Sequence, residues 1–482
     1  MLIDSTTVFL PSLKTDCPIA KDPGIYLPKL QFFRGRGLVV ARDGGYGKNA
    51  LHLAVEAGPH AAGHDQSDKG TFTLRAFGAD LVIDSGYGND GNPKGSGSSF
   101  AHNVVLIDGQ GQPMNWHNSS DGEITGLRHT ETFDWIRTSA VNAWNFRYAD
   151  KEKLPTGQNV EKADRHYLLV RSTGDGIPPY VVTFDDFRKK DGMKHEFTWQ
   201  WHTPPENQFQ IGETSWTSAA AGGSFRTLTT KPDKCRGKAV FELTAPETGR
   251  FWIAGLTRCA GADPGKSDSF WVKLNGGPRF CWDLVISLNF TWSLLKDREA
   301  GTPHILNLTK GEKVRCEIFA REPEAQLAFL ALTPADKGLP PFPNDETSIP
   351  NDGSMLGASS AEKTEDPFLL ETVTQETSKA VLTVFPVSTP AGNTSTEWFT
   401  TSKEGAHPKL LHSVQTVEPK FLMVLIPRKD DSGVLPTVKA LHPTSDQIGT
   451  EIRWTCGRVD RIVFRPGENG MAPEFQRETE QK

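Results

Sequence analysis

Apolar and polar residues alternate over short runs along most of this chain, which is the pattern of strands with one buried face. In residues 71–77, for example, Phe72, Leu74 and Ala76 fall on one face. Gly, Pro, Asn and Asp separate such runs at spacings that suit hairpins. Stretches with the 3.6-residue period of a helix are scarce, so the sequence predicts an all-β protein of the sandwich type. Further runs of this kind cover residues 37–41, 81–83, 103–107, 166–170, 180–184, 238–243 and 313–319.

Two stretches rich in small, polar or Pro residues interrupt the strand pattern, at 214–223 and 335–366. A compact, aromatic-rich unit lies between them, and strand patterning resumes afterwards, for example at 421–426. We therefore predict a β-sandwich in two parts with a second unit inserted between them. The predicted order is a lead-in at 1–30, the first part of the sandwich at 31–232, the inserted unit at 233–334, a linker at 335–366, the second part at 367–467 and a frayed tail at 468–482.

Composition narrows the class of protein. The 482 residues are 37% hydrophobic and 23% charged, with a formal net charge of −6, which indicates a folded globular protein and disfavours a broad basic surface for nucleic acid. The longest apolar runs suit buried strands and are too short to span a bilayer, so no membrane partner is expected. The first residues lack the basic segment and apolar core of a secretory signal. That leaves two interpretations, a cytosolic protein or a chain whose natural start lies further upstream.

The six cysteines lie far apart and form no CxxC pair, which disfavours a zinc ribbon. Four of them fall between 235 and 316. They are consistent either with disulfides in an oxidising compartment or with buried thiols.

Polar residues gather around residues 63–88, GHDQSDKGTFTLRAFGADLVIDSGYG. Asp84 ends an apolar strand, where a carboxylate is costly unless a cation or hydrogen-bond donors meet it. His102 and Asn103 begin the strand that follows. A frame of loops and strands is able to bring His64, Gln66, Asp84 and His102 together. The alternative is that these residues only cap strands and form turns.

These motifs resemble the C-terminal β-sandwich domain of heparinase II/III-like polysaccharide lyases and related alginate lyases. In that family a His-x-His-x-Asp-x-x-x-Phe segment precedes a strand ending in Asp-x-Gly and then a Ser/Ala-His-Asn strand. His64, Asp68, Phe72, Asp84 and His102 match the pattern. FRGRGLVVARDGG at 33–45, RHYLLVRSTGDGIPPYVVTFDDF at 165–187 and HEFTWQWHTP at 195–204 look like further parts of the domain. The resemblance implies a large antiparallel β-sandwich over about 30–215, resuming near 366–466.

The family can bind zinc through the second His of the first motif, the strand Asp and the later His. The corresponding residues here are Gln66, Asp84 and His102. Because an amide is a weaker ligand than an imidazole, zinc affinity should fall. Either a weakly bound divalent ion or a hydrogen-bonded cluster without metal fits the sequence, and the latter is slightly favoured.

The resemblance implies β-elimination on a uronate-containing polysaccharide. A base removes the proton next to the carboxylate, a donor stabilises the resulting charge, and an acid protonates the leaving oxygen. His64 is the first candidate for proton transfer or charge neutralisation, and Tyr87, Asn103 and His60 are weaker ones. A histidine with a purely structural role is the alternative for His64.

The family normally carries a helical toroid that supplies further catalytic groups, and no long amphipathic helix appears in this sequence. Three accounts fit: a truncated gene or chain, a subunit that needs a separate helical partner, or a non-catalytic descendant.

The inserted unit resembles the jelly-roll carbohydrate-binding modules appended to polysaccharide-degrading enzymes. Its segments SDSFWVKLNGGPRFCWDL, FTWSLL and GEKVRCEIFAREPEAQLAFLALTP have counterparts there. Sugar rings pack their C–H faces on aromatic planes, which makes Trp282 and Trp292 candidates, with Trp271 a weaker one and Arg321 a charged contact. Aromatic residues that only fill the core, and an Arg321–Glu322 ion pair, are the alternatives.

Together these observations favour a lyase-derived protein that acts on acidic polysaccharide of the heparan or alginate type. A non-catalytic polysaccharide-binding protein is the alternative. By resemblance we expect a periplasmic or secreted location.

Overall fold

The computed structural model confirms an all-β, antiparallel architecture. It describes residues 28–44, 50–60, 65–85, 95–113, 120–146, 158–173, 176–220, 222–231, 237–335, 339–340, 343, 345–363, 368–375, 380–387, 391–401, 405–429, 435–442, 444, 446–467 and 470–479. Within these ranges the only α-helix is α1 (Val141–Asn145), and no helix has the length and apolar character needed to cross a membrane.

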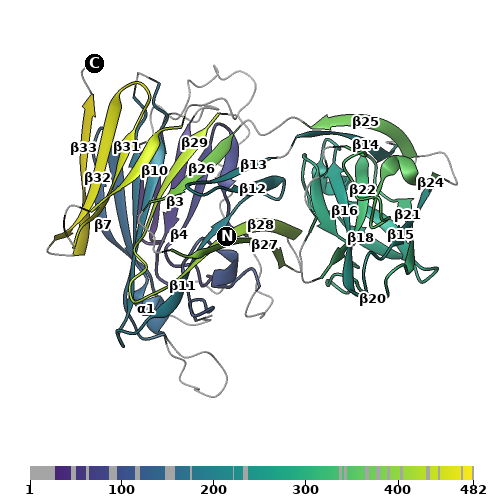
Figure 1. Cartoon of the computed structure of the whole chain (residues 1–482), viewed down its shortest axis with the longest axis horizontal. Coiled ribbons are helices and arrows are strands. Elements are labelled where there is room, and N and C mark those ends of the chain that lie inside the picture. Colours follow the sequence, from purple (N-terminus) through teal and green to yellow (C-terminus); the bar gives the residue numbers. More distant parts are fainter. Residues whose placement is uncertain are drawn as a thin grey trace.

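The larger part of the molecule contains four antiparallel sheets, which lie on the left of Figure 1. The first sheet contains β1 (Leu30–Phe33), β2 (Leu38–Asp43), β3 (Leu51–Glu56), β4 (Thr71–Ala76) and β5 (Ala79–Val82). The central sheet contains, in spatial order, β12 (Asn207–Ile211), β13 (Trp216–Ala220), β26 (Val381–Pro386), β29 (Phe421–Arg428), β10 (Tyr180–Lys189), β9 (Val160–Val170), β8 (Phe133–Ser139) and β7 (Glu123–His129). A third sheet contains β27 (Asn393–Thr401), β28 (Gly405–Thr416), β11 (His195–His202) and β6 (Leu106–Ile107), and the last contains β30 (Thr437–Leu441), β31 (Ile448–Arg453), β32 (Arg458–Gly467) and β33 (Gly470–Thr479). The 3₁₀ turn η2 (Ser99–Ala101) precedes β6.

The central sheet is covered on both faces, because successive residues of its strands enter different cores. Val181 of β10 packs with the first and third sheets, whereas its neighbour Val182 packs with the last sheet. On β9, Leu169 likewise packs with the first and third sheets, and Leu168 packs with the last sheet. All eight residues of β29 are buried. This explains its continuous apolar run, since a strand buried on both faces has no solvent side to fill with polar residues.

The inserted unit is a two-sheet sandwich on the right of Figure 1. One sheet contains β19 (Thr291–Leu294), β16 (Gly249–Cys259), β22 (Ala325–Pro334), β14 (Gly223–Thr230) and β25 (Phe368–Gln375), with β20 (Ile305–Leu308) paired to β16 and β23 (Met355–Gly357) paired to β22. The other contains β18 (Phe280–Asp283), β17 (Ser269–Leu274), β21 (Lys313–Ala320), β15 (Lys238–Thr244) and β24 (Glu362–Lys363). The short turns η3 (Pro264–Lys266) and η4 (Ala358–Ser360) complete it. Cys259, Cys281 and Cys316 are buried free thiols in this unit.

Strand pairing shows that the unit is an insertion and extends its boundaries. β13 and β26, which flank it in the sequence, pair directly, with Thr217 opposite Thr383. β14 and β25 pair along their whole lengths and carry the chain in and out of the unit. The inserted unit therefore spans 223–375, wider than the expected 233–334.

Two further expectations about organisation are corrected. The stretch 335–366 was predicted as a linker, yet β23, η4 and β24 lie within it and join both sheets of the inserted unit. The stretch 468–482 was predicted to fray, yet residues 470–479 form β33. That strand pairs with β32 over ten residues, and its Phe475 packs against the apolar core between the central sheet and the last sheet.

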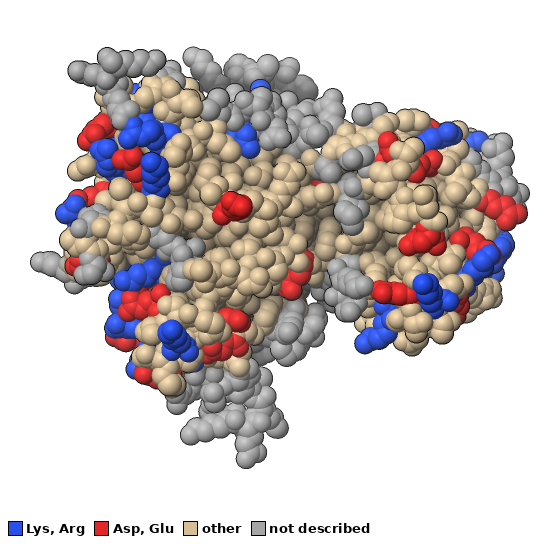
Figure 2. All heavy atoms as spheres, in the orientation of Figure 1, with Lys and Arg blue, Asp and Glu red and all other residues tan. Residues whose placement is uncertain are grey.

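Charged residues are unevenly distributed over the face in Figure 2. Basic and acidic side chains are intermixed at the two ends of the molecule, and few lie across its middle.

Candidate functional site

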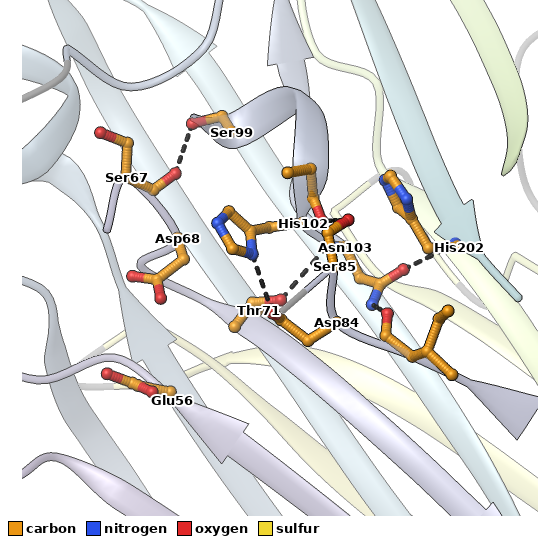
Figure 3. Close-up of polar contacts among 12 residues, drawn as sticks. Glu56, Ser67, Asp68, Thr71, Asp84, Ser85, Ser99, His102, Asn103 and His202 are labelled. Atoms are coloured by element: carbon orange, nitrogen blue, oxygen red, sulfur yellow. Dashed lines mark hydrogen bonds and ion pairs between the residues drawn. The ribbon is translucent and has the colours of Figure 1, made fainter. Parts of the chain in front are cut away.

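The first motif lies where three connections of the larger part converge. Asp68 lies in the connection from β3 to β4, Asp84 follows β5, and His102 and Asn103 follow η2. Ser99 of η2 ties two of these connections together, because its hydroxyl donates to the Ser67 carbonyl at 2.5 Å and accepts from the Gln112 amide at 2.9 Å. Segments distant in the sequence are thus held side by side (Figure 3).

At the centre of the site is a buried imidazole–carboxylate pair. His102 Nδ1 lies 2.8 Å from Asp84 Oδ2, and the His102 side chain is 0% exposed (Figure 3). Burial alone would lower the pKa of His102, but the charge of Asp84 and its hydrogen bond outweigh burial, so the pKa is raised. Nε2 of His102 has no hydrogen-bond partner among the described residues. The predicted meeting of Asp84 and His102 is therefore present in the structure.

Asn103 holds the site together through its backbone contacts. Its amide Nδ2 donates to the carbonyls of Phe72 and Ile83 at 3.0 and 2.7 Å, and its Oδ1 accepts the His202 amide at 2.8 Å. Both side-chain donors are thereby committed to backbone carbonyls. This geometry gives Asn103 a positioning role and leaves no donor for the catalytic role expected from the sequence.

An acidic group beside the pair is balanced by cations. Glu56 ends β3 and lies 3.0 Å from Arg36 Nη2, while Lys69 Nζ lies 3.0 Å from Asp68 and 4.0 Å from Glu56. Burial, followed by the charge of Asp68, raises the pKa of Glu56 to about 7, against the opposing effect of Lys69 and Arg36. For Lys69, burial lowers the pKa but Asp68 and Glu56 raise it more, so this buried amine stays charged.

A buried Arg supports these connections from the central sheet. Arg165 of β9 contacts Asp185 of β10 through Nε and Nη2, and its Nη1 donates to the carbonyls of Gly70 and Asn103. Tyr167, two residues along β9, donates its hydroxyl to Gly70 at 2.6 Å. Arg165 and Asp185 are almost completely inaccessible to solvent. The pair therefore anchors the site to the middle layer.

Two further histidines approach the same region, and sequence reasoning missed them as a pair. His202 ends β11 and His407 lies on the neighbouring β28; His202 Nδ1 and His407 Nε2 are 2.9 Å apart. Ser85 Oγ, one residue beyond Asp84, is 3.2 Å from His407 Nε2. Burial, then His407 and Lys409, lower the pKa of His202 far below its usual value, and burial and Lys409 lower that of His407 to about 3. Both rings are therefore neutral at neutral pH.

The remaining catalytic candidates are His64, Tyr87 and His60. His64 and Tyr87 lie outside the described residues. His60 is buried, its backbone amide donates to Asp121 at 2.8 Å, and burial together with Lys69 lowers the pKa of its ring. This arrangement fits a structural role for His60.

The zinc site that the resemblance implies requires at least three protein ligands. Gln66 is half-buried, and Asp84 and His102 are adjacent. Within the described ranges, however, no three His, Cys, Asp or Glu side chains are arranged to hold a metal ion. Glutamine is not among these residue types, so the set of Gln66, Asp84 and His102 stays a prediction.

The structure corrects the expected sugar contacts of the inserted unit. Trp282 and Trp292 are each 0% exposed. Trp282 packs in the core between the two sheets and donates its Nε1 hydrogen to the Leu294 carbonyl at 2.9 Å, and Trp292 packs in a second apolar cluster. Neither ring has a face open to a sugar. Arg321, in contrast, is half-buried at the surface and contacts Glu322 and Ser269.

The layered sheets and their buried polar site define a large antiparallel β-sandwich domain. The family model for heparinase II/III-like C-terminal domains matches residues 28–290. This chain therefore belongs to the heparinase II/III-like C-terminal domain family.

Comparison with solved structures gives distant likenesses. A heparan sulfate lyase, HepC, from Pedobacter heparinus has a TM-score of 0.43 and 9% identity, and the match covers 94% of this chain and 43% of that chain. A heparinase III gene product has a TM-score of 0.42 and 13% identity, with coverage of 94% and 43%. This chain thus spans less than half the length of either protein. A search of curated proteins found no match.

Proposed function

We propose that this chain forms the β-sandwich side of a lyase site that cleaves a uronate-containing polysaccharide by β-elimination. The observation that carries the proposal is the buried His102–Asp84 pair within the family-matched region. In this proposal the pair supports the segment that bears His64, and His64 transfers a proton or neutralises the substrate carboxylate. The site requires no zinc, and the protein acts in the periplasm or outside the cell.

The reaction needs more groups than the buried pair and Asn103 offer. A base must remove the proton next to the carboxylate, and an acid must protonate the departing oxygen. His102 is inaccessible to solvent and the donors of Asn103 are committed. We therefore propose that a helical domain, on this polypeptide or on a partner, supplies the second proton-transfer group.

The same observations favour one alternative, a protein that binds acidic polysaccharide without cleaving it. A buried imidazole with no access to substrate is consistent with a site retained for stability alone. The two functions differ in a product, because elimination creates an unsaturated uronate that absorbs ultraviolet light.

Ultraviolet absorbance with heparan sulfate, alginate, hyaluronan and pectin tests the proposal. With the chain supplied with a helical partner domain, we expect absorbance to rise with one of them, and His64→Ala to abolish that rise. His442→Ala removes an exposed histidine of the larger part and serves as the matched control, with unchanged rate. If the chain, supplied with a helical partner domain, produces no absorbance on any polymer yet still retains one of them in a binding assay, the alternative holds.

A further inference from the structure

The outer face of one sheet of the inserted unit carries a row of aromatic and basic side chains. Along β17, Phe270 and Val272 point into the core, so Trp271 and Lys273 point outward. Strand register places Phe319 of β21 directly opposite Trp271, and Lys238 of β15 opposite Phe319. Trp271 and Phe319 are half-buried, so part of each ring remains at the surface.

A guanidinium lies over both rings. The Cζ atom of Arg279 is 5.0 Å from the Trp271 ring centroid and 4.8 Å from that of Phe319. Arg321 approaches Trp271 to 5.5 Å, and Lys238 approaches Phe319 to 5.7 Å. Arg279 is itself exposed. Contact with two aromatic rings restricts the guanidinium, while its planar set of N–H donors remains available to an anionic group.

The neighbouring charges leave Arg279 uncompensated. Glu317 is shared by Lys238 at 2.8 Å and Arg315 at 3.2 Å, and Glu322 pairs with Arg321. Among the described residues no carboxylate forms an ion pair with Arg279. The face therefore combines excess positive charge with a fork of donors whose orientation is set in advance, which suits a carboxylate or sulfate group.

A second carboxylate pair lies at the edge of this face without cancelling its charge. The backbone amide of Asp268 donates to Glu322 Oε2 at 3.0 Å, and burial, together with the hydrogen bond and charge of Glu322, raises the pKa of the Asp268 carboxyl to about 7. Asp283, on the neighbouring β18, accepts Arg298 Nε at 3.0 Å through both carboxylate oxygens. Among the described residues neither acid forms an ion pair with Arg279, and the charge of Asp283 is balanced by Arg298.

We propose that this outer face, centred on Arg279 above Trp271 and Phe319, binds the carboxylate or sulfate groups of an acidic polysaccharide. That the ligand is an acidic polysaccharide rests on the proposed function. That it carries an anionic group rests on the uncompensated charge of Arg279. The row of Lys238, Phe319 and Trp271 crosses three strands, or ~10 Å at ~4.8 Å per strand spacing, enough for more than one sugar ring. Exposed aromatic edges beside the cations offer contact to sugar C–H groups.

The proposal is tested by affinity electrophoresis of the full chain in gels containing heparan sulfate, alginate or neutral dextran. We expect retardation by an acidic polymer and none by dextran. Retardation by both acidic polymers identifies the carboxylate as the bound group, and retardation by heparan sulfate alone identifies the sulfate. Arg279→Ala should weaken binding about tenfold or more, because a charge-assisted contact is lost. Arg279→Lys should lose most of the affinity too, since an ammonium lacks the planar fork.

Lys313→Ala is the matched control, because Lys313 lies on the same sheet and pairs with Glu242. It removes the same charge from the chain and should change affinity less than twofold. Equal losses in the two variants, no retardation by any acidic polymer, or equal retardation by single-stranded DNA would each overturn the proposal. Circular dichroism confirms that each variant folds.

This binding test is independent of elimination. Retardation that depends on Arg279, without ultraviolet product, supports the binding face and counts against the lyase. Product formation with binding that ignores Arg279 overturns only the binding face.

Discussion

Replacing Arg165 with Met should destabilise the larger part of the molecule more than any surface charge change. The substitution keeps a long apolar side chain beside Phe72 and Tyr167, which now contact the guanidinium. It removes the contacts to Asp185 and the donors to Gly70 and Asn103. Because Asp185 is 0% exposed, water cannot replace the lost partner.

The expected loss follows from these contacts. Breaking a buried ion pair by removing one partner costs ~3–5 kcal/mol. The Asn103 carbonyl also loses the Arg165 donor, whereas the Gly70 carbonyl keeps the Tyr167 hydroxyl. We therefore expect the free energy of unfolding to fall by about 4 kcal/mol, within the range given for such pairs.

Urea unfolding followed by Trp fluorescence measures this loss. Only the transition of the larger part should shift, so the inserted unit serves as an internal reference. Arg188→Met, on the adjacent strand of the same sheet, removes an Arg whose partners Glu161 and Glu418 lie near solvent and should have a far smaller effect. The double variant Arg165→Met, Asp185→Leu should regain much of the stability, since no buried charge is then left unpaired.

The effect should also depend on pH. Burial raises the pKa of Asp185 above its unfolded value, and without Arg165 that pKa rises further. The folded variant then holds a proton that the unfolded chain releases, so its stability falls as pH rises through the interval between the two pKa values. A loss below about 1 kcal/mol at neutral pH, or a double variant no more stable than the single one, would refute the assigned role of the pair.

Three further predictions follow from burial and charge. Trp282→Ala should lower the stability of the inserted unit by about 3–5 kcal/mol through the cavity it leaves. Urea unfolding measures that loss, and the variant in its folded state should bind polysaccharide with unchanged affinity. A loss of affinity in the folded variant would contradict the core assignment. Burial raises the pKa of Glu56 from 4.5 to about 7, so its protonated form stabilises the fold below pH 4.5 and this contribution is lost as pH rises to 7. The melting temperature of Glu56→Gln should therefore change less with pH across that window than that of the unmodified chain. The same pH dependence in both proteins would exclude the shift. Elemental analysis should find less than one zinc per purified chain, and a chelator should leave the melting temperature unchanged. Gln66→His offers an additional imidazole and should bind more zinc. One zinc per unmodified chain would show that the site holds metal without that imidazole.

Much of the fold could be predicted because strand patterns are local. Alternation at 71–77 and the apolar run at 421–426 correspond to β4 and β29. Asp84 and His102 were predictable partners because only 18 residues separate them in the sequence, and an acid at the end of an apolar strand requires a partner.

What the sequence left open concerns contacts between distant strands and the choice of face. His202 and His407 meet only because β11 pairs with β28 across 205 residues, and no local pattern specifies that register. Likewise β33 looks like a polar tail until β32 pairs with it, and 335–366 looks like a linker until two sheets bind its strands.

The tryptophans show the same division most clearly. A period of two residues determines that Trp271 and its strand neighbours point to alternate faces, but not which face water reaches. The facing sheet of the inserted unit, which contains β16 and β22, covers Trp282 of β18, while Trp271 of β17 remains at the surface beneath Arg279. The sequence by itself therefore determined strands, fold class and the local Asp84–His102 pair. Packing of sheet against sheet decided which aromatic and charged groups meet solvent, because burial depends on residues that lie far away along the chain.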